Sequence, residues 1–192
     1  MDQTAVRLTH LSSADYKRMP WKNGGGMTTE IMAEPGPTGG FDWRLSIAEV
    51  AQSGPFSDFS GYDRTIMLIE GAGFVLDFDQ APSKRVDRPF EPFPFAGEWQ
   101  ADCTLIDGPV RDFNLMTARD RISANLDILR PTQRISVPAS RTLVVHALRG
   151  DIVVRSEKLA AGDTLRIDSA ETPVEITGDS AAVVAAIRID LR

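Results

Sequence analysis

The sequence predicts an all-β protein, a sandwich or a barrel, with a jelly roll as the leading candidate. Short segments rich in β-branched and aromatic residues recur along the chain, and Gly, Pro and Asp residues separate them. Several of these segments alternate apolar and polar residues with period two, as half-buried strands do. No amphipathic pattern of helical length interrupts them.

The composition is that of an ordinary globular protein, with one domain or two small fused halves. Of the 192 residues, 42% are hydrophobic and 25% are charged, and the formal net charge is −6. An acidic chain lacks the basic surface of a nucleic-acid binder, and no apolar run approaches the roughly 20 residues that span a bilayer. The segment 1–19 has no apolar region typical of a signal peptide, and the single cysteine, Cys103, excludes an intrachain disulfide. We therefore expect a cytoplasmic protein that binds neither nucleic acid nor membrane.

Predicted strands in the first two thirds lie between Gly-rich and Pro-rich turns. They fall at residues 5–8, 28–33, 41–50, 65–69, 74–78 and 110–117. The segment 12–17 reads as at most one helical turn. Gly71-Ala72-Gly73 separates 65–69 from 74–78, so we expect these two strands to form a hairpin. The proline-rich stretch 79–97 is expected to be extended, with short edge strands.

The last third reads as a series of short strands at close spacing. They are predicted at residues 125–130, 142–148, 152–154, 164–167, 174–177 and 181–191. The segment 181–186 has helical propensity, but the alternation that continues to Leu191 favours a strand.

The stretch Met19–Glu30 concentrates polar chemistry around three consecutive glycines. Glycine has no Cβ, so Gly24-Gly25-Gly26 can approach another group closely, and the adjacent Lys22 would strengthen an anion-binding turn. A plain mobile turn with a packed Trp21 is the alternative. A phosphate-binding P-loop is excluded, because Lys22 precedes the glycines and no Gly-Lys-Ser/Thr follows them.

Several segments together resemble the HutD/Ves family. They are MPWKNGGG at 19–26, FDWRLSIAEV at 41–50, GPFS at 54–57, GYDR at 61–64, FAGEW at 95–99 and GPVRDFNLM at 108–116. These motifs span roughly the first two thirds of the chain, and the last third is only generically similar. The resemblance implies a cupin-type, RmlC-like jelly-roll β-barrel, with two cupin-like halves (a bicupin) in one chain. The halves would cover about 1–120 and 121–192, and an exchange of strands between them stays open.

The resemblance also implies a link to bacterial histidine utilisation, through binding of a pathway intermediate rather than an established reaction. Most cupin enzymes hold a metal through two histidines one residue apart, a glutamate and a further histidine. This chain has only His10 and His146, without a His-x-His motif. We therefore expect a metal-independent protein without a cofactor, with His146 in the core and His10 in a surface loop.

The predicted ligand-binding residues are Trp21, Lys22, Asn23, Arg44, Ser46, Arg64 and Asn114. Arginine carries a planar fork of donors that suits a carboxylate, and asparagine can both donate and accept hydrogen bonds. Trp21, with Trp43 and Trp99, would provide an aromatic wall.

Each of these residues also has a purely structural interpretation. Arg44 would then pair with Glu30 or Glu49, Arg64 would pair with Asp63 or cap a turn, and the tryptophans would lie in the core.

The leading hypothesis is a binding protein for a small carboxylate-bearing metabolite, resembling urocanate or a formylated glutamate, with a regulatory or accessory role. Arg44 and Arg64 would hold the negative charge. One alternative is a metal-independent isomerase or lyase, with acid–base groups among Glu30, Glu98 and Asp112. Another is a stress-related protein whose pocket is vestigial. The sequence leaves open the ligand, the catalytic residues if any exist, and the oligomeric state, for which a homodimer is one option.

Overall fold

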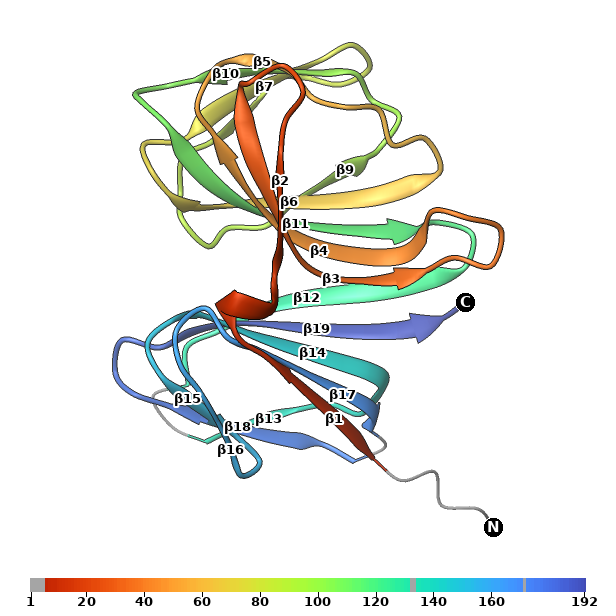
Figure 1. Ribbon diagram of the computed structural model, residues 1–192, viewed down its shortest axis with the longest axis vertical. Coiled ribbons are helices and arrows are strands. Elements are labelled where there is room, and N and C mark those ends of the chain that lie inside the picture. Colours follow the sequence, from red (N-terminus) through yellow and green to blue (C-terminus); the bar gives the residue numbers. More distant parts are fainter. Residues whose placement is uncertain (1–5, 132–133, 171) are drawn as a thin grey trace. The chain divides into compact units, whose positions relative to one another are not determined.

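The computed structural model describes residues 6–131, 134–170 and 172–192, which form an all-β protein with one short 3₁₀ turn at Ser13–Asp15 (Figure 1). The chain divides into two compact units. One unit is Tyr16–Ile122, and the other joins the N-terminal segment through Asp15 to Ser123–Arg192. No helix among the described residues is long and apolar enough to cross a membrane.

The unit Tyr16–Ile122 contains a six-stranded and a four-stranded sheet. The six-stranded sheet has the order β2 (Lys17–Pro20), β3 (Gly26–Pro35), β4 (Phe41–Val50), β11 (Val110–Ala118), β6 (Tyr62–Glu70) and β9 (Phe93–Ala96). The four-stranded sheet has the order β5 (Gly54–Pro55), β10 (Ala101–Leu105), β7 (Phe74–Phe78) and β8 (Lys84–Val86). Figure 1 shows β11 beside β4, and the pairing registers place it between β4 and β6.

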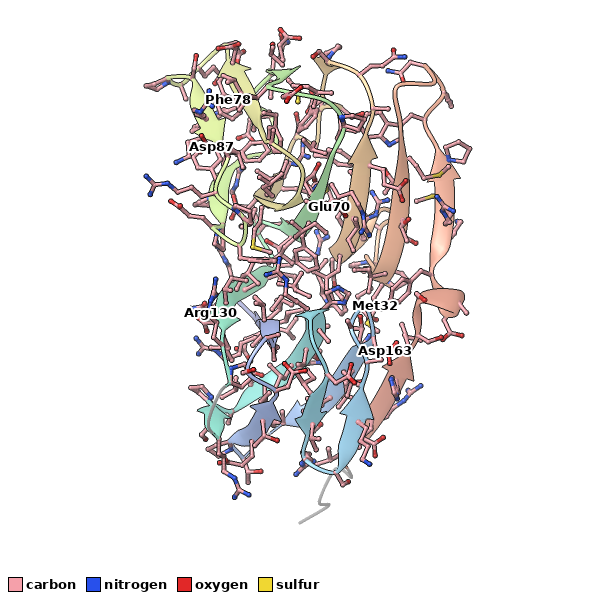
Figure 2. All side chains as sticks on the ribbon, turned by 90° about the vertical axis from the view of Figure 1, so that its left-hand side faces the viewer. Met32, Glu70, Phe78, Asp87, Arg130 and Asp163 are labelled. Carbon is pink, nitrogen blue, oxygen red and sulfur yellow. The ribbon has the colours of Figure 1, made fainter. Side chains whose placement is uncertain are left out.

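The core of this unit lies between the two sheets and mixes aliphatic with aromatic side chains. It includes Val50, Ile66 and Leu68 from one sheet and Phe74 and Leu76 from the other. A ring cluster extends it: the centroid of Phe78, labelled in Figure 2, lies 6.1 Å from Phe93, 5.4 Å from Phe95 and 5.4 Å from Trp99.

The second unit contains a five-stranded and a four-stranded sheet. The five-stranded sheet has the order β1 (Arg7–Leu11), β17 (Thr164–Ala170), β14 (Ser140–Arg149), β19 (Val183–Leu191) and β12 (Ile122–Leu129). The four-stranded sheet has the order β13 (Ile135–Val137), β18 (Val174–Gly178), β15 (Ile152–Val154) and β16 (Glu157–Leu159). Its buried core is aliphatic, with Leu143 and Leu165 facing Ile152 and Ile176 from the other sheet.

The predicted all-β class is confirmed, and three predicted strands, 41–50, 74–78 and 152–154, coincide with β4, β7 and β15. The strands β2, β13 and β16 were not predicted, because three or four residues give too little alternation to recognise. The predicted strand 5–8 lies partly outside the described residues, and β1 begins at Arg7.

The predicted hairpin between 65–69 and 74–78 is wrong. β6 and β7 belong to different sheets, and β7 pairs with β8 and β10. Gly71 and Gly73 have φ values of 101° and 100°, and a Cβ at Gly73 would clash with the carbonyl oxygen of Val86. These glycines therefore let the chain leave one sheet and enter the other instead of folding back.

A closed barrel is not confirmed, because the sheets stay open. In the unit Tyr16–Ile122 the edge strands β2, β5 and β9 contain Pro20, Pro55 and Pro94. Proline has no backbone N–H to donate to a further strand, so it helps to end the hydrogen-bond ladder. That each unit is a cupin half stays a prediction.

Candidate functional site

A cavity of about 490 Å³ opens in the unit Tyr16–Ile122, within the size range of small-molecule pockets. Its wall contains all seven predicted ligand-binding residues: Trp21, Lys22, Asn23, Arg44, Ser46, Arg64 and Asn114. The other lining residues are Met19, Pro20, Thr28, Ala48, Pro55, Phe56, Ser57, Phe59, Asp112 and Met116. The structure thus brings the predicted residues together around one space, and their binding of a ligand stays a prediction.

Three adjacent strands supply the polar part of this wall. Met116 of β11 lies opposite Arg44 of β4 on one side and opposite Arg64 of β6 on the other. Two residues before Met116 on β11, Asn114 lies opposite Ser46 of β4. Because residues two apart on a strand point to the same face, the register places these side chains on the inner face of the sheet.

Arg64 is a buried cation with weak partners. Only 5% of its surface is exposed. Its Nη2 donates to Oδ1 of Asn114 at 3.2 Å and its Nη1 donates to the carbonyl oxygen of Ser57 at 3.4 Å, while Nε has no hydrogen-bond partner. Asp63, one predicted partner, instead accepts a hydrogen bond from Arg119 at 2.6 Å. Among the described residues, no carboxylate forms an ion pair with Arg64 within 4.0 Å.

Three phenylalanine rings surround the Arg64 guanidinium. Their centroids lie 5.7 Å (Phe56), 5.1 Å (Phe59) and 4.8 Å (Phe95) from Cζ. Aromatic faces attract a cation, but they do not replace the hydrogen bonds that water would give it. Burial lowers the pKa of Arg64 to about 10, with a smaller lowering by Arg44, while Asp112 opposes the shift. The guanidinium therefore stays charged at neutral pH.

Asp112 and Asn114 form a buried polar pair beside Arg64. Asp112 is 0% exposed, its Oδ1 accepts a hydrogen bond from Nδ2 of Asn114, and its Oδ2 has no partner. Asn114 therefore bridges the two charges, with its carbonyl oxygen toward Arg64 and its amide NH₂ toward Asp112. Burial raises the pKa of Asp112 to about 7, although Arg64 and the hydrogen bond from Asn114 act in the opposite direction.

Arg44 forms one of the predicted alternative ion pairs and still lines the cavity. Its Nε lies 2.8 Å from Oε2 of Glu30, and 14% of the Arg44 side chain is exposed. This pair uses one of the five N–H donors of the guanidinium. The structural interpretation of Arg44 and its place in the cavity wall are therefore compatible.

The turn between β2 and β3 places Trp21, Lys22 and Asn23 in the wall. Nε1 of Trp21 donates to Oγ1 of Thr28 at 2.8 Å, and the Gly25 amide donates to Oδ1 of Asn23 at 3.0 Å. A Cβ at Gly26 would lie 3.0 Å from the Trp21 ring and 2.5 Å from the carbonyl oxygen of Glu49, so the close packing requires glycine. Lys22 is exposed and forms no ion pair among the described residues.

Two residues that were expected in the cavity wall do not line it, and several residues that do line it were not predicted. Trp43 is buried in the core with 2% exposed, and Trp99 packs on Phe78. The missed residues include the rings of Phe56 and Phe59. The GPFS motif marked Phe56 as part of a recognisable segment, but only the fold shows that its ring reaches Arg64.

The two histidines lie in the other unit. His146 is buried, as expected, and its Nδ1 forms a 2.8 Å hydrogen bond with Thr164. His10 lies in β1 instead of the expected loop, and its Nε2 is 3.3 Å from Oδ2 of Asp163, which Figure 2 labels. In the described ranges no three His, Cys, Asp or Glu side chains are grouped to hold a metal ion.

Comparisons with known proteins agree on one family. The family described as HutD matches residues 13–184. An uncharacterised 21.2 kDa protein in the hutC 3′ region of Pseudomonas putida is 46% identical over 142 residues, which cover 73% of this chain and 74% of that protein. Protein Ves of Citrobacter koseri is 38% identical over 156 residues, covering 79% and 76% of the two chains.

The fold of this chain is also similar to those of solved structures. HutD from Pseudomonas fluorescens SBW25, in a structure described as a formate condition, has 39% identity and a TM-score of 0.87, covering 97% of this chain and 100% of that one. The bacterial pirin YhhW in complex with nickel(II), from Escherichia coli, has 11% identity and a TM-score of 0.71, covering 95% and 98% of the two chains. The second likeness shows a cupin-like all-β fold alone.

Proposed function

Because the chain belongs to the HutD family, we propose that its cavity binds a small carboxylate-bearing metabolite, in a regulatory or accessory role in histidine utilisation. The hut designation in the names of two relatives supports the pathway link. The formate condition named for the Pseudomonas fluorescens structure is consistent with a carboxylate, since formate is the smallest one. The proposal requires neither a metal nor a cofactor.

The observation that carries the proposal is the buried Arg64 guanidinium. A buried charge is stable only when a counter-charge and hydrogen bonds replace water. Arg64 has two long hydrogen bonds to neutral oxygens and an Nε without a partner. A ligand carboxylate in the adjacent cavity would supply both the charge and the acceptors, in the paired geometry that arginine favours.

The rest of the wall favours a small organic anion with one carboxylate held in the interior. Arg44 shares its charge with Glu30, and Arg64 shares its charge with Asp112 through Asn114. This balance suits one added negative charge better than the two of a phosphate. The cavity of about 490 Å³ is not filled by side chains, which is why we do not favour a vestigial pocket.

Titration calorimetry with formate, acetate, urocanate and N-formyl-L-glutamate tests the proposal. Wild-type protein should bind at least one of these carboxylates, and the corresponding amide should bind much more weakly. Arg44→Ala should weaken binding, whereas Arg111→Ala is a matched control, because Arg111 is exposed and pairs with Glu70. The absence of any binding at millimolar carboxylate would overturn the proposal.

A second candidate, a metal-independent isomerase or lyase, is favoured by one observation. The pKa of Asp112 is raised to about 7 by burial, and an efficient acid–base group has a pKa near the working pH. NMR of each carboxylate incubated with the protein in deuterated water separates the two functions. Conversion of the compound or uptake of deuterium would indicate catalysis, and an unchanged spectrum of a bound compound would favour binding alone.

A further inference from the structure

We propose that binding of a carboxylate at Arg64 is accompanied by uptake of one proton from solvent at Asp112, with Asn114 coupling the two residues. This inference rests on the function proposed above and adds a thermodynamic property to the same site. Asp112 lines the cavity, but we assign it a positioning role, because its hydrogen bond goes to Asn114, which in turn contacts Arg64.

The geometry of the three residues provides the coupling. The Asn114 amide has one available orientation, because its oxygen accepts from Arg64 and its nitrogen donates to Asp112. Asp112 therefore offsets part of the Arg64 charge through the Asn114 amide, without a direct ion pair. Its Oδ2 accepts no hydrogen bond from the described residues, so this oxygen is available for a proton.

Charge balance provides the reason for proton uptake. Without ligand and above about pH 7, the charge of ionised Asp112 offsets that of Arg64 through Asn114, and Glu30 offsets Arg44 directly. An added carboxylate at Arg64 brings a second negative charge close to the buried Asp112, and like charges repel strongly where solvent screening is weak. Glu30 is 26% exposed and has a direct 2.8 Å contact with Arg44, an ion pair of a kind that Asp112 lacks among the described residues. Asp112 is completely buried and is the carboxylate that gains most by becoming neutral.

The neighbouring elements contain few other groups that could account for such a proton. The other charged side chains of the cavity wall are Arg64, whose lowered pKa of about 10 still leaves it cationic near neutral pH, Arg44 and Lys22. Burial raises the pKa of the Cys103 thiol on β10 to about 12, so it remains protonated. The sequence of Tyr16–Ile122 contains no histidine. The pKa of Asp112, raised to about 7, places its titration where the uptake can be measured.

Calorimetry of formate or N-formyl-L-glutamate in buffers of different ionisation enthalpy measures the proton directly. The carboxyl groups of both probes are fully ionised above about pH 6, so they contribute no proton. Uptake should approach about one proton at about pH 8, and the affinity should fall up to about tenfold per pH unit above pH 7. Binding with the same enthalpy in every buffer, and with no dependence on pH, would overturn this inference while leaving the proposed function intact. If no carboxylate binds at any pH, the proposed function itself fails.

Asp112→Asn should bind the same probes without proton uptake and with an affinity that is nearly constant between about pH 6 and 9, because asparagine stays neutral. Asp102→Asn is the matched control: Asp102 is an exposed aspartate on β10 and should retain the wild-type pH profile. A merely structural role of Asp112 would change the affinity equally at every pH. If Asp112→Asn fails to fold, the wild-type buffer series alone decides the question.

Discussion

The two units of the chain share a construction, a larger sheet packed on a four-stranded one, but differ in what fills the space between the sheets. In the second unit the inner face of β14 carries Leu143, Val145 and Ala147, and the core is aliphatic. In the unit Tyr16–Ile122 the inner face of β4 changes from Arg44 and Ser46 near one end to apolar residues at the other.

This difference shows that two packed sheets can enclose either a close-packed apolar core or a cavity with a polar wall, depending on the residues that face inward. Arginine, aspartate and asparagine at inward-facing positions of adjacent strands prevent close packing, because each buried polar group needs a hydrogen-bond partner and space for it. A local loss of stability is the usual consequence of such a site. Leu165→Ala in the close-packed apolar core should therefore affect mainly stability, and Arg64→Met in the cavity wall should affect mainly ligand binding.

The largest effect on stability is expected for Leu165→Ala in the aliphatic core. Leu165 is 0% exposed, and truncating such a leucine lowers the free energy of unfolding by about 2–5 kcal/mol. Urea unfolding followed by circular dichroism measures the loss. Carboxylate affinity of the folded protein should stay unchanged, because the lining residues all belong to Tyr16–Ile122. A loss of affinity in the folded variant would show that the two units are coupled.

In contrast to Leu165→Ala, Arg64→Met should weaken carboxylate binding more than it changes stability. The loss of a charge-assisted hydrogen bond of about 1.5–3 kcal/mol should weaken carboxylate binding by about 10-fold to 100-fold. The free energy of unfolding at about pH 6 should change little, because methionine replaces a poorly compensated buried charge with an apolar side chain and Asp112, with its pKa raised to about 7, is mostly neutral there. Calorimetry and urea unfolding check both parts, with Arg111→Met as the exposed control. Unchanged affinity would remove Arg64 from the site.

Asp112 should make the stability of its unit depend on pH. Burial raises its pKa from 3.8 to about 7, so the folded state binds the proton more tightly than the unfolded state does. The contribution to stability is therefore fully present below pH 3.8 and is lost as the pH rises toward about 7, by up to about 1.4 kcal/mol per pH unit. Asp112→Asn lacks this contribution, so its stability relative to wild type should improve from pH 5 to 7 and then level off. Parallel unfolding curves across that range would contradict the assignment.

Much of the candidate site could be predicted from local sequence. In the predicted strand 41–50, Arg44 and Ser46 are two residues apart and so share one face, and both line the cavity. Alternation of this kind is typical of a half-buried strand, but Trp43 and Leu45 on the other face of β4 are buried as well. Period-two patterning shows which residues share a face but not what covers that face.

The features that could not be predicted depend on contacts between distant segments. The hydrogen bond between Arg64 and Asn114 joins residues 50 positions apart, and only the register of β6 with β11 brings them together. The incorrect prediction of a hairpin between 65–69 and 74–78 has the same cause. The glycines at 71 and 73 indicate a change of direction, but a local pattern does not specify which strand β7 meets next.

The smallest effect is expected for Lys22→Ala, which compares an exposed cation of the cavity wall with the buried one. Lys22 lies in solvent, where charge interactions are worth under about 1 kcal/mol, so carboxylate affinity should fall only about twofold to fourfold. The loss should disappear near 1 M salt, where the screening length is about 3 Å. Lys158→Ala, an exposed lysine of the second unit, is the control and should change nothing. A loss as large as that of Arg64→Met would place the main ligand charge at the exposed part of the wall, and the weak partners of Arg64 would then need an explanation other than a bound anion.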